Sequence, residues 1–395
     1  MELILFMICV FGISYLVGML FDLVKLPRLL GYLLTGLIIG NFFDYQYLIT
    51  NQTVNVITSF AISIILLKAG LGIEKAIIKK IGISVILLGT IPNIIEAIIL
   101  ATATYFLLGF EVYEALMFGF IVSAVSPAVV IPSMTKLMDD GFDKEVTTLN
   151  LAATSFDDVV SLTLFSVFLA LYLGSGNTTF LLVTAPIKIL LGGIIGALIG
   201  FGLGKLLKHT MCIKYQVIQF IIVIAFSIAL KQYGHYLFII EMIAIMTLGY
   251  YLNDSNPMVG GYIKYYTDII WKYAQVFLFF IIGFLANVTI IGDYLFIGIG
   301  IIILGLLGRT LGVIISLSRS DFTPKQKAFS MIGNIPKATV QAVLGAVPLS
   351  IGATHGDVIL SLSALAIIFT APIGLLLIDI FSHKLLHRNI VKATS

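Results

Sequence analysis

The sequence predicts an all-α polytopic membrane protein with about thirteen membrane-spanning helices. Three observations support this prediction: the composition of the chain, the spacing of its apolar stretches and the distribution of its basic residues. Hydrophobic residues make up 59% of the 395 residues, and charged residues only 11%. A soluble domain carries roughly 25% charged residues because its surface must be solvated. A chain with less than half of that fraction cannot cover itself in water.

Apolar stretches follow one another along the whole chain. A helix needs about 20 mostly apolar residues to cross a bilayer. Thirteen stretches of roughly this length are separated by polar or Gly/Pro-containing breaks, at 2–20, 29–43, 54–70, 82–108, 115–138, 145–172, 179–204, 215–231, 235–252, 268–290, 293–317, 326–349 and 355–381. No polar gap is long enough to hold a soluble domain. We therefore expect the chain to consist of membrane-spanning helices and their loops, with a short tail at 382–395.

The loop lysines and arginines test this count independently. With thirteen spans, nearly all of them fall on the face that carries the C-terminus, and only Lys231 falls on the opposite face. The residues on the C-terminal face are Lys25, Arg28, Lys75, Lys79, Lys80, Lys136, Lys144, Lys205, Lys208, Lys214, Lys264, Lys272, Arg319, Lys325, Lys327, Lys384, Arg388 and Lys392. Basic loops stay in the cytoplasm, so the C-terminus is predicted inside and the N-terminus outside.

The composition argues against several other classes of protein. The net charge is only +3 and there is no basic run, so nucleic-acid binding is not predicted. Cys9 and Cys212 belong to no CxxC or His/Cys cluster, which argues against a disulfide framework or a structural zinc site. We find no catalytic signature and expect neither an enzyme nor a cofactor.

Five charged residues lie in the middle of predicted spans: Glu96, Asp157, Asp158, Arg309 and Lys337. A charge at the bilayer centre costs at least roughly 2.5–3.5 kcal/mol, so each of these groups needs a partner, water or a function.

The strongest of these signals is the run from Thr154 through Ser155 to Asp157 and Asp158 inside an apolar stretch. Adjacent helical residues point about 100° apart, so one carboxylate can face an ion path while the other meets a partner. Two carboxylates this close are expected to titrate as a coupled pair. Carboxylate and hydroxyl oxygens also suit hard cations.

Two predicted spans carry helix breaks. The fifth contains Pro127 and Pro132, and the twelfth contains Gly333 and Pro336. Proline removes a backbone donor and frees carbonyl groups one turn earlier. Unwound backbone at membrane depth survives only where it lines a cavity or is buried in protein.

The two breaks occupy equivalent places in the chain. If residues 1–178 form one six-helix repeat, 179–210 a linker helix and 211–381 a second repeat, the fifth span corresponds to the twelfth. An odd linker inverts the second repeat. Broken helices at matching positions of inverted repeats indicate a transporter with its substrate site at the midplane.

The sequence resembles the monovalent cation/proton antiporter superfamily, and most closely its NHA branch of sodium/proton antiporters, over essentially the whole chain. The motifs that carry the resemblance are Ser126 to Met134 (SPAVVIPSM), Ser155-Phe156-Asp157-Asp158, Pro336 to Ala342 (PKATVQA), Leu67 to Gly72 (LKAGLG) and Gly308-Arg309-Thr310.

The resemblance implies a homodimer in the cell membrane, with an ion-carrying core domain that moves against a dimerisation domain. It implies exchange of Na⁺ or Li⁺ for H⁺ by alternating access. Asp158 would bind the cation and the proton, with Asp157 beside it as a further Na⁺ ligand. Ser126, Thr154 and Ser155 are the available hydroxyls. The chain has Ser126 where many relatives carry an aspartate, which leaves the ligand shell open.

The resemblance also implies a basic partner for Asp157, and both Lys337 and Arg309 qualify. A pair of Glu96 with Arg309 leaves Lys337 for Asp157, and the swapped assignment remains open. Electrogenic and electroneutral stoichiometry are both open too. The alternatives within transport are a K⁺/H⁺ antiporter and an organic-anion carrier of the same fold. The paired aspartates argue against the latter, and no filter-like motif indicates a channel.

Overall fold

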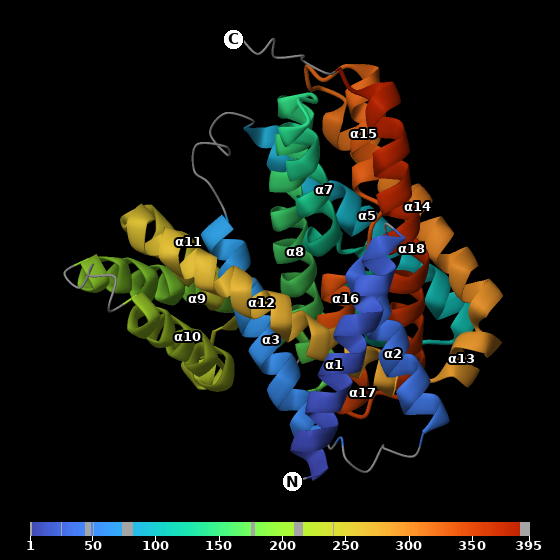
Figure 1. The fold of residues 1–395 in the computed structure, drawn as a ribbon, viewed down its shortest axis with the longest axis horizontal. Helices are drawn as coiled ribbons and strands as arrows, with labels where there is room; N and C mark the ends of the chain where they lie inside the picture. Colours follow the sequence, from blue (N-terminus) through green and yellow to red (C-terminus); the bar gives the residue numbers. More distant parts are fainter. Residues whose placement is uncertain are drawn as a thin grey trace. The chain divides into compact units, whose positions relative to one another are not determined.

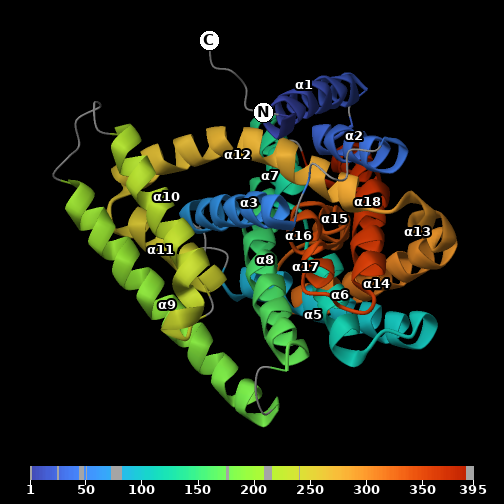
Figure 2. The same cartoon turned by 90° about the horizontal axis from the view of Figure 1, so that it is seen from below.

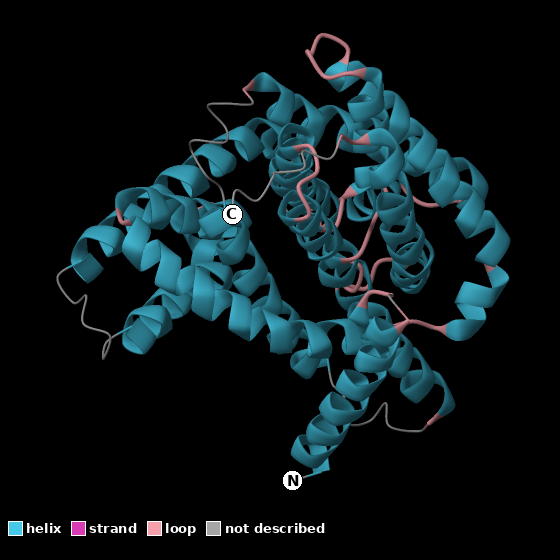
Figure 3. Cartoon of the chain, turned by 45° about the horizontal axis from the view of Figure 1, so that its top comes forward, coloured by secondary structure: helices cyan, strands magenta, loops and turns pink. Residues whose placement is uncertain are grey.

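The chain is helical throughout the part that the computed structural model describes, residues 2–24, 26–43, 49, 51–72, 82–174, 178–208, 216–239 and 241–387. Figure 3 shows helices joined by loops, with no strand among these residues. The main helices are α1 (Glu2–Leu23), α2 (Arg28–Phe42), α3 (Asn51–Gly72), α5 (Ile83–Leu108), α6 (Val112–Ser123), α7 (Pro127–Asp139), α8 (Lys144–Tyr172), α9 (Thr178–Lys208), α10 (Gln216–Tyr233), α11 (Glu241–Ser255), α12 (Pro257–Leu285), α14 (Leu295–Leu317), α15 (Pro324–Gly333) and α18 (Gly356–Leu385). Short helices complete the list: η3 (Gly234–Leu237), α13 (Val288–Asp293), α16 (Thr339–Leu344) and α17 (Val347–Ser350).

Nine of the described helices are long and apolar enough to cross a membrane. Shorter apolar helical segments accompany them at Arg28–Phe42, Val112–Ser123, Val129–Met138 and Thr339–Ser350. Each of the thirteen predicted stretches coincides with a helix or with consecutive helical pieces. An all-helical, multi-span architecture is thus confirmed, while the number of crossings stays a prediction.

The largest boundary error concerns the stretch predicted at 268–290, because α12 already begins at Pro257 and ends at Leu285. The side chain of Asn256 accepts a hydrogen bond from the Val259 N–H (3.3 Å), so it caps the helix just before a proline at its first position. The first turns of α12 are too polar for a hydropathy window to include them. Lys264, which precedes the predicted stretch, therefore lies within a helix, as does Lys272.

Several of the basic residues used for the orientation argument lie outside the described residues. They are Lys25, Lys75, Lys79, Lys80, Lys214, Arg388 and Lys392.

The chain divides into two compact units. Unit 1 consists of Met1–Gln46, Ala76–Phe165 and Phe279–Ser395, and unit 2 of Tyr47–Lys75 and Ser166–Leu278. Both units therefore combine segments from the two halves of the chain. The predicted repeats describe a symmetry of sequence order rather than a set of contacts, so they remain a prediction.

Unit 2 is a helical bundle of its own. Within it, α11 packs against α9 and α3, and α10 contacts both α3 and α11, an arrangement that can be followed in Figure 2. Two ion pairs lie in this unit, Lys68 with Asp268 (2.6 Å) and Lys231 with Glu241 (2.9 Å). All four side chains keep some exposure to solvent, so each pair is worth little, about 0–1 kcal/mol.

Unit 1 is organised around α5, which packs against α14 (Figure 1) and also against α6. Glycines let the backbones touch. A Cβ added at Gly119 of α6 would lie 2.4 Å from the carbonyl oxygen of Ala97, and one at Gly312 of α14 would lie 2.4 Å from the Cα of Pro92. These close approaches bring the polar residues of α5 within reach of α6 and α14.

The two interrupted helices meet at their breaks inside unit 1. The first break separates α6, which ends at Ser123, from α7, and the second separates α15 from α16. The N–H of Ser126 donates to the carbonyl of Pro336 (2.8 Å), which joins the two unwound segments directly.

Three of the four residues expected to mark the breaks lie at them. Pro127 begins α7, Gly333 ends α15, and Pro336 is in the unwound segment that follows. Pro132 is the exception, because it lies inside the continuous helix α7. Near a helix start, a proline removes only one intrahelical hydrogen bond, and α7 accommodates that loss.

The close packing of α14 on α5 gives a first prediction. Gly312→Ala places a methyl group against the Pro92 backbone and should lower the free energy of unfolding by about 1–3 kcal/mol. Gly300→Ala is the matched control on the same helix, because nothing lies within 4 Å of its added Cβ. It should be neutral or slightly stabilising. Thermal unfolding in detergent measures both, and equal effects would contradict the packing argument.

Candidate functional site

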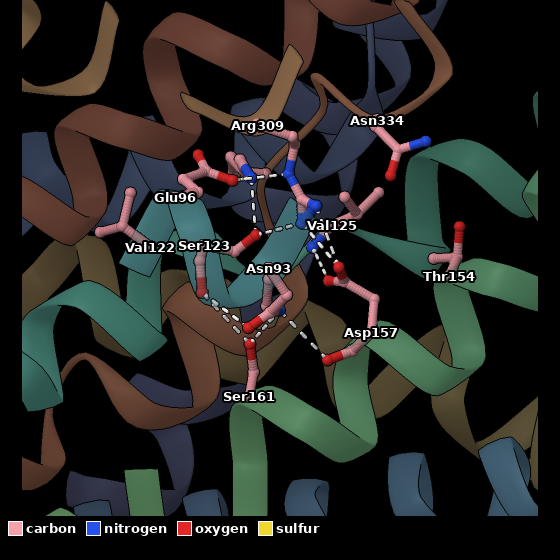
Figure 4. Close-up of polar contacts among 12 residues, drawn as sticks. Asn93, Glu96, Val122, Ser123, Val125, Thr154, Asp157, Ser161, Arg309 and Asn334 are labelled. Atoms are coloured by element: carbon pink, nitrogen blue, oxygen red, sulfur yellow. Dashed lines mark hydrogen bonds and ion pairs between the residues drawn. The ribbon is translucent and has the colours of Figure 1, made fainter. Parts of the chain in front are cut away.

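A buried cluster of charged side chains lies where α5, α8 and α14 meet the breaks (Figure 4). Arg309 of α14 stands between two carboxylates. Its Nε donates to Glu96 of α5 (2.5 Å), and its two terminal nitrogens donate to Oδ1 of Asp157 on α8 (2.9 and 2.6 Å). Each of these residues is 1% exposed. A guanidinium is suited to this position because its N–H donors form a rigid planar fork.

Lys337 approaches the same cluster from the unwound segment after α15. Its ammonium group donates to Glu96 (2.7 Å) and to the backbone carbonyl of Ser123 (2.7 Å). The expected contact of Glu96 with Arg309 is present, and of the two candidate partners left open for Asp157, Arg309 rather than Lys337 is the one in contact. Among the described residues no hydrogen bond or ion pair joins Lys337 to Asp157, and Arg309 holds Asp157 instead. One guanidinium is wide enough to bridge two carboxylates, which leaves the ammonium to Glu96.

The C-terminal end of α6 is capped by side chains from other helices. Its last carbonyl groups have no partner within the helix. Ser123 offers its carbonyl to Arg309 (2.6 Å) as well as to Lys337, and the partial negative charge of a helix C-terminus favours such cations. The amide of Gln341 on α16 donates to three more carbonyls, those of Ile121, Val122 and Ala124.

Asp157 is held from a second side as well. Its Oδ2 accepts a hydrogen bond from the backbone N–H of Val125, in the break after α6 (2.7 Å). Both carboxylate oxygens of Asp157 therefore have donors, one from a side chain and one from the backbone.

An uncharged network supports the cluster from below in Figure 4. Asn93 of α5 donates to the hydroxyl of Ser161 (2.7 Å) and to the backbone carbonyl of Asp157 (3.3 Å), and it accepts from the hydroxyl of Ser123 (3.2 Å). These amide and hydroxyl groups are fully buried. The network fixes α5, α6 and α8 relative to one another at the depth of the charges.

The second aspartate has a different environment. Asp158 is 4% exposed, and its Oδ1 has no hydrogen-bond partner among the described residues. The hydroxyl of Ser126, fully buried at the start of α7, is likewise without a partner in that part of the chain. Thr154 donates to the carbonyl of Asn150 (2.7 Å). The side chain of Ser155 lies outside the described residues.

The charges of this region do not balance. Three carboxylates (Glu96, Asp157 and Asp158) face two basic groups (Arg309 and Lys337), so the fully ionised cluster carries one excess negative charge. An uncompensated buried charge costs several kcal/mol. One monovalent cation or one proton removes the excess. Asp158 is the carboxylate with an oxygen free to take it.

Sequence reasoning missed the uncharged members of the site. Asn93, Ser123, Ser161 and Gln341 are all fully buried and make the contacts that orient the charged groups. One signal was available for two of them. Asn93 lies three residues before Glu96, and Gln341 four residues after Lys337, so in a helix each shares a face with a buried charge.

Comparisons with known proteins agree on one family. The family model described as sodium/hydrogen exchanger, transmembrane, matches residues 9–381. Sodium/hydrogen exchanger 9B2 of Mus musculus is 30% identical over 97% of this chain and 74% of its own length. Sodium/hydrogen exchanger 9B1 of Macaca fascicularis is 29% identical over 92% and 74%, respectively. The structure of the sodium proton antiporter MjNhaP1 from Methanocaldococcus jannaschii shares the fold, with a TM-score of 0.83 at 21% identity over 97% of this chain and 98% of that one.

The ion pair between Glu96 and Arg309 gives a second prediction. Glu96→Ala and Arg309→Ala should each lower the free energy of unfolding by about 3–5 kcal/mol, because each leaves buried charges without a partner. The double variant should lose less than the sum of the two, as measured by thermal unfolding in detergent.

The control for this cycle is the partly exposed pair Lys231–Glu241, whose removal should cost about 0–1 kcal/mol. Strict additivity of the Glu96 and Arg309 losses would show that the two side chains do not stabilise each other.

Proposed function

This chain belongs to the sodium/hydrogen exchanger family, and from that membership we propose that it is a secondary active antiporter exchanging Na⁺ or Li⁺ for H⁺. It is a multi-pass membrane transporter of that family rather than an enzyme. The proposed exchange uses alternating access, so that one site faces each side of the membrane in turn.

The observation that carries the proposal is the contrast between the two aspartates. Asp157 has donors on both oxygens and a guanidinium beside it. Asp158 is buried next to it with an oxygen that has no partner among the described residues. A group that must be neutralised, and that no fixed cation neutralises, binds either a proton or a metal cation, but not both at once. That competition is what couples the two ions.

Na⁺ and Li⁺ fit the atoms available around Asp158. They are hard cations that prefer oxygen ligands. We propose that Asp158 supplies the charged ligand, with Thr154, Ser126 and Ser155 as candidate hydroxyl ligands. Asp157 contributes mainly its charge, since both of its oxygens already accept hydrogen bonds.

The same contacts support an electroneutral exchange of one proton for one cation. The partner of Asp157 is an arginine, which does not release its proton in proteins. Lys337 is held by Glu96 and by the carbonyl of Ser123 rather than by either aspartate. Asp158 is then the one group in the cluster that exchanges a proton during transport.

We further propose the arrangement in the membrane. The basic loop residues support a cytoplasmic C-terminus and an external N-terminus with thirteen crossings. The matching positions of the two breaks support inverted repeats over 1–178 and 211–381. A homodimer in the cell membrane follows from the family resemblance.

The third prediction separates the two aspartates. Asp158→Asn keeps the shape of the side chain but cannot titrate or supply charge, so Na⁺-driven proton movement in proteoliposomes should disappear. Asp157→Asn keeps the ion-binding carboxylate, so part of the exchange should survive with an altered pH dependence. Gel filtration checks that both variants are folded. Transport by folded Asp158→Asn at the wild-type rate would place the site elsewhere.

The fourth prediction concerns stoichiometry. With one proton moved per Na⁺, transport carries no net charge, so the initial rate should not respond when valinomycin and K⁺ gradients set the membrane potential. A rate that changes with potential would mean that a second proton moves, and Lys337 would be the group to examine.

A further inference from the structure

Polar side chains join α8 to α15 beside the aspartates. The amide nitrogen of Asn150 on α8 donates to the carbonyl of Val146 (2.8 Å) and to the hydroxyl of Ser330 on α15 (3.0 Å). The amide nitrogen of Asn334, at the end of α15, donates to Oδ1 of Asn150 (3.2 Å) and to the carbonyl of Ser330 (2.8 Å). This seam, formed by Asn150, Ser330 and Asn334, is buried, and Asn334 is only 5% exposed.

These contacts fix which way the amide of Asn334 faces. A backbone carbonyl can only accept, so the nitrogen of Asn150 must face Val146 and its oxygen must face Asn334. Both N–H groups of Asn334 are then used. In the described part of the chain nothing donates to its Oδ1, which is left as a carbonyl-type acceptor without a partner.

That acceptor lies on the side of α8 that carries Asp158, because Asn334 contacts Asn150, two helical turns before Asp158 on the same face of the helix. Thr154 and Asn334 both contact Asn150, and Figure 4 shows their oxygen atoms turned toward the space between them, on one side of Asp157. The Thr154 hydroxyl donates its hydrogen bond to the backbone carbonyl of Asn150, so its oxygen still offers lone pairs. Asp158 follows Thr154 by four residues, which places it on the same face of α8.

We propose that Oδ1 of Asn334 is an uncharged ligand of the transported cation and a determinant of its selectivity. This inference rests on the proposed function. Asp158, Thr154 and Asn334 together present oxygens whose own protons are engaged elsewhere or absent, which suits a bare metal cation.

This ligand affects the binding of the metal cation but not the binding of the proton. A metal cation needs several oxygen ligands in place of its hydration shell, and the number of carbonyl dipoles around it affects which ion is preferred. A proton needs only the carboxylate of Asp158. Asn334 therefore strengthens the binding of Na⁺ or Li⁺ without a matching effect on the binding of the proton.

The test is the Na⁺ and Li⁺ dependence of proton movement in proteoliposomes that contain Asn334→Ala. Loss of one ligand to a charged group should raise the half-saturating Na⁺ concentration about tenfold and change the Na⁺/Li⁺ preference. The maximal rate at saturating Na⁺ should be nearly kept. Asn334→Ser is the second variant, because its hydroxyl can still donate to the Ser330 carbonyl one turn back but brings no amide oxygen.

The matched control is Ser330→Ala. It removes a hydroxyl from the same seam but leaves the Ser330 carbonyl that orients Asn334. If Asn334 serves only to hold α15 against α8, all three variants should lose stability and maximal rate alike, with unchanged half-saturating Na⁺ and Na⁺/Li⁺ preference. That result overturns the inference while leaving the exchange itself intact.

Na⁺-dependent thermal stabilisation of purified protein gives a readout that does not depend on transport. It should need about tenfold more Na⁺ in Asn334→Ala than in the Ser330→Ala control. If the unmodified protein shows neither Na⁺-driven proton movement nor stabilisation by Na⁺, the proposed function fails, and this inference falls with it.

Discussion

Arg309 must pair with two carboxylates at once in the buried interior, and this requirement organises unit 1. Its contacts to Glu96 and Asp157 are possible only if α5, α8 and α14 converge at one depth. Glycine at 312 permits that approach between α14 and α5. The backbone carbonyl of Ser123 is a further acceptor for Arg309, and it is available because α6 ends there. The pairing of the buried charges therefore depends on the interruption of the helix after α6.

The pairing of charges also distinguishes two neighbouring aspartates, Asp157 and Asp158. Asp157 is held in place by ion pairs and hydrogen bonds to both of its carboxylate oxygens. Asp158 takes no part in these contacts, and its Oδ1 has no hydrogen-bond partner among the described residues. When every member is ionised, the cluster as a whole carries one excess negative charge. A site of this kind favours a single positive charge at any time, whether proton or metal cation, because every other charge in the cluster already has its counterpart.

The sequence was sufficient for most of the helices and for the five charged residues of the cluster. Apolar length and composition are local properties, so Glu2–Leu23 or Ile83–Leu108 could be placed within a few residues. The start of α12 was missed because its first turns are polar and its cap, Asn256, acts through a side-chain contact. The sequence left the partner of Asp157 open, because the choice between Lys337 and Arg309 depends on the reach of a guanidinium across three helices. Asn93 and Gln341 were missed because a neutral amide in an apolar stretch stands out only by its spacing from a buried charge.

The central claim is that one proton and one metal cation compete for Asp158, and the pH dependence of Na⁺ binding tests it most directly. Na⁺ binding to purified protein in detergent can be measured by calorimetry at a series of pH values. On the acid side, displacement of one proton per Na⁺ predicts that the apparent dissociation constant rises about tenfold for each unit of pH lowered. Protons released per Na⁺ bound should approach one over the same range. An affinity independent of pH across that range, with no proton release, would contradict competition at a single carboxylate and with it the mechanism.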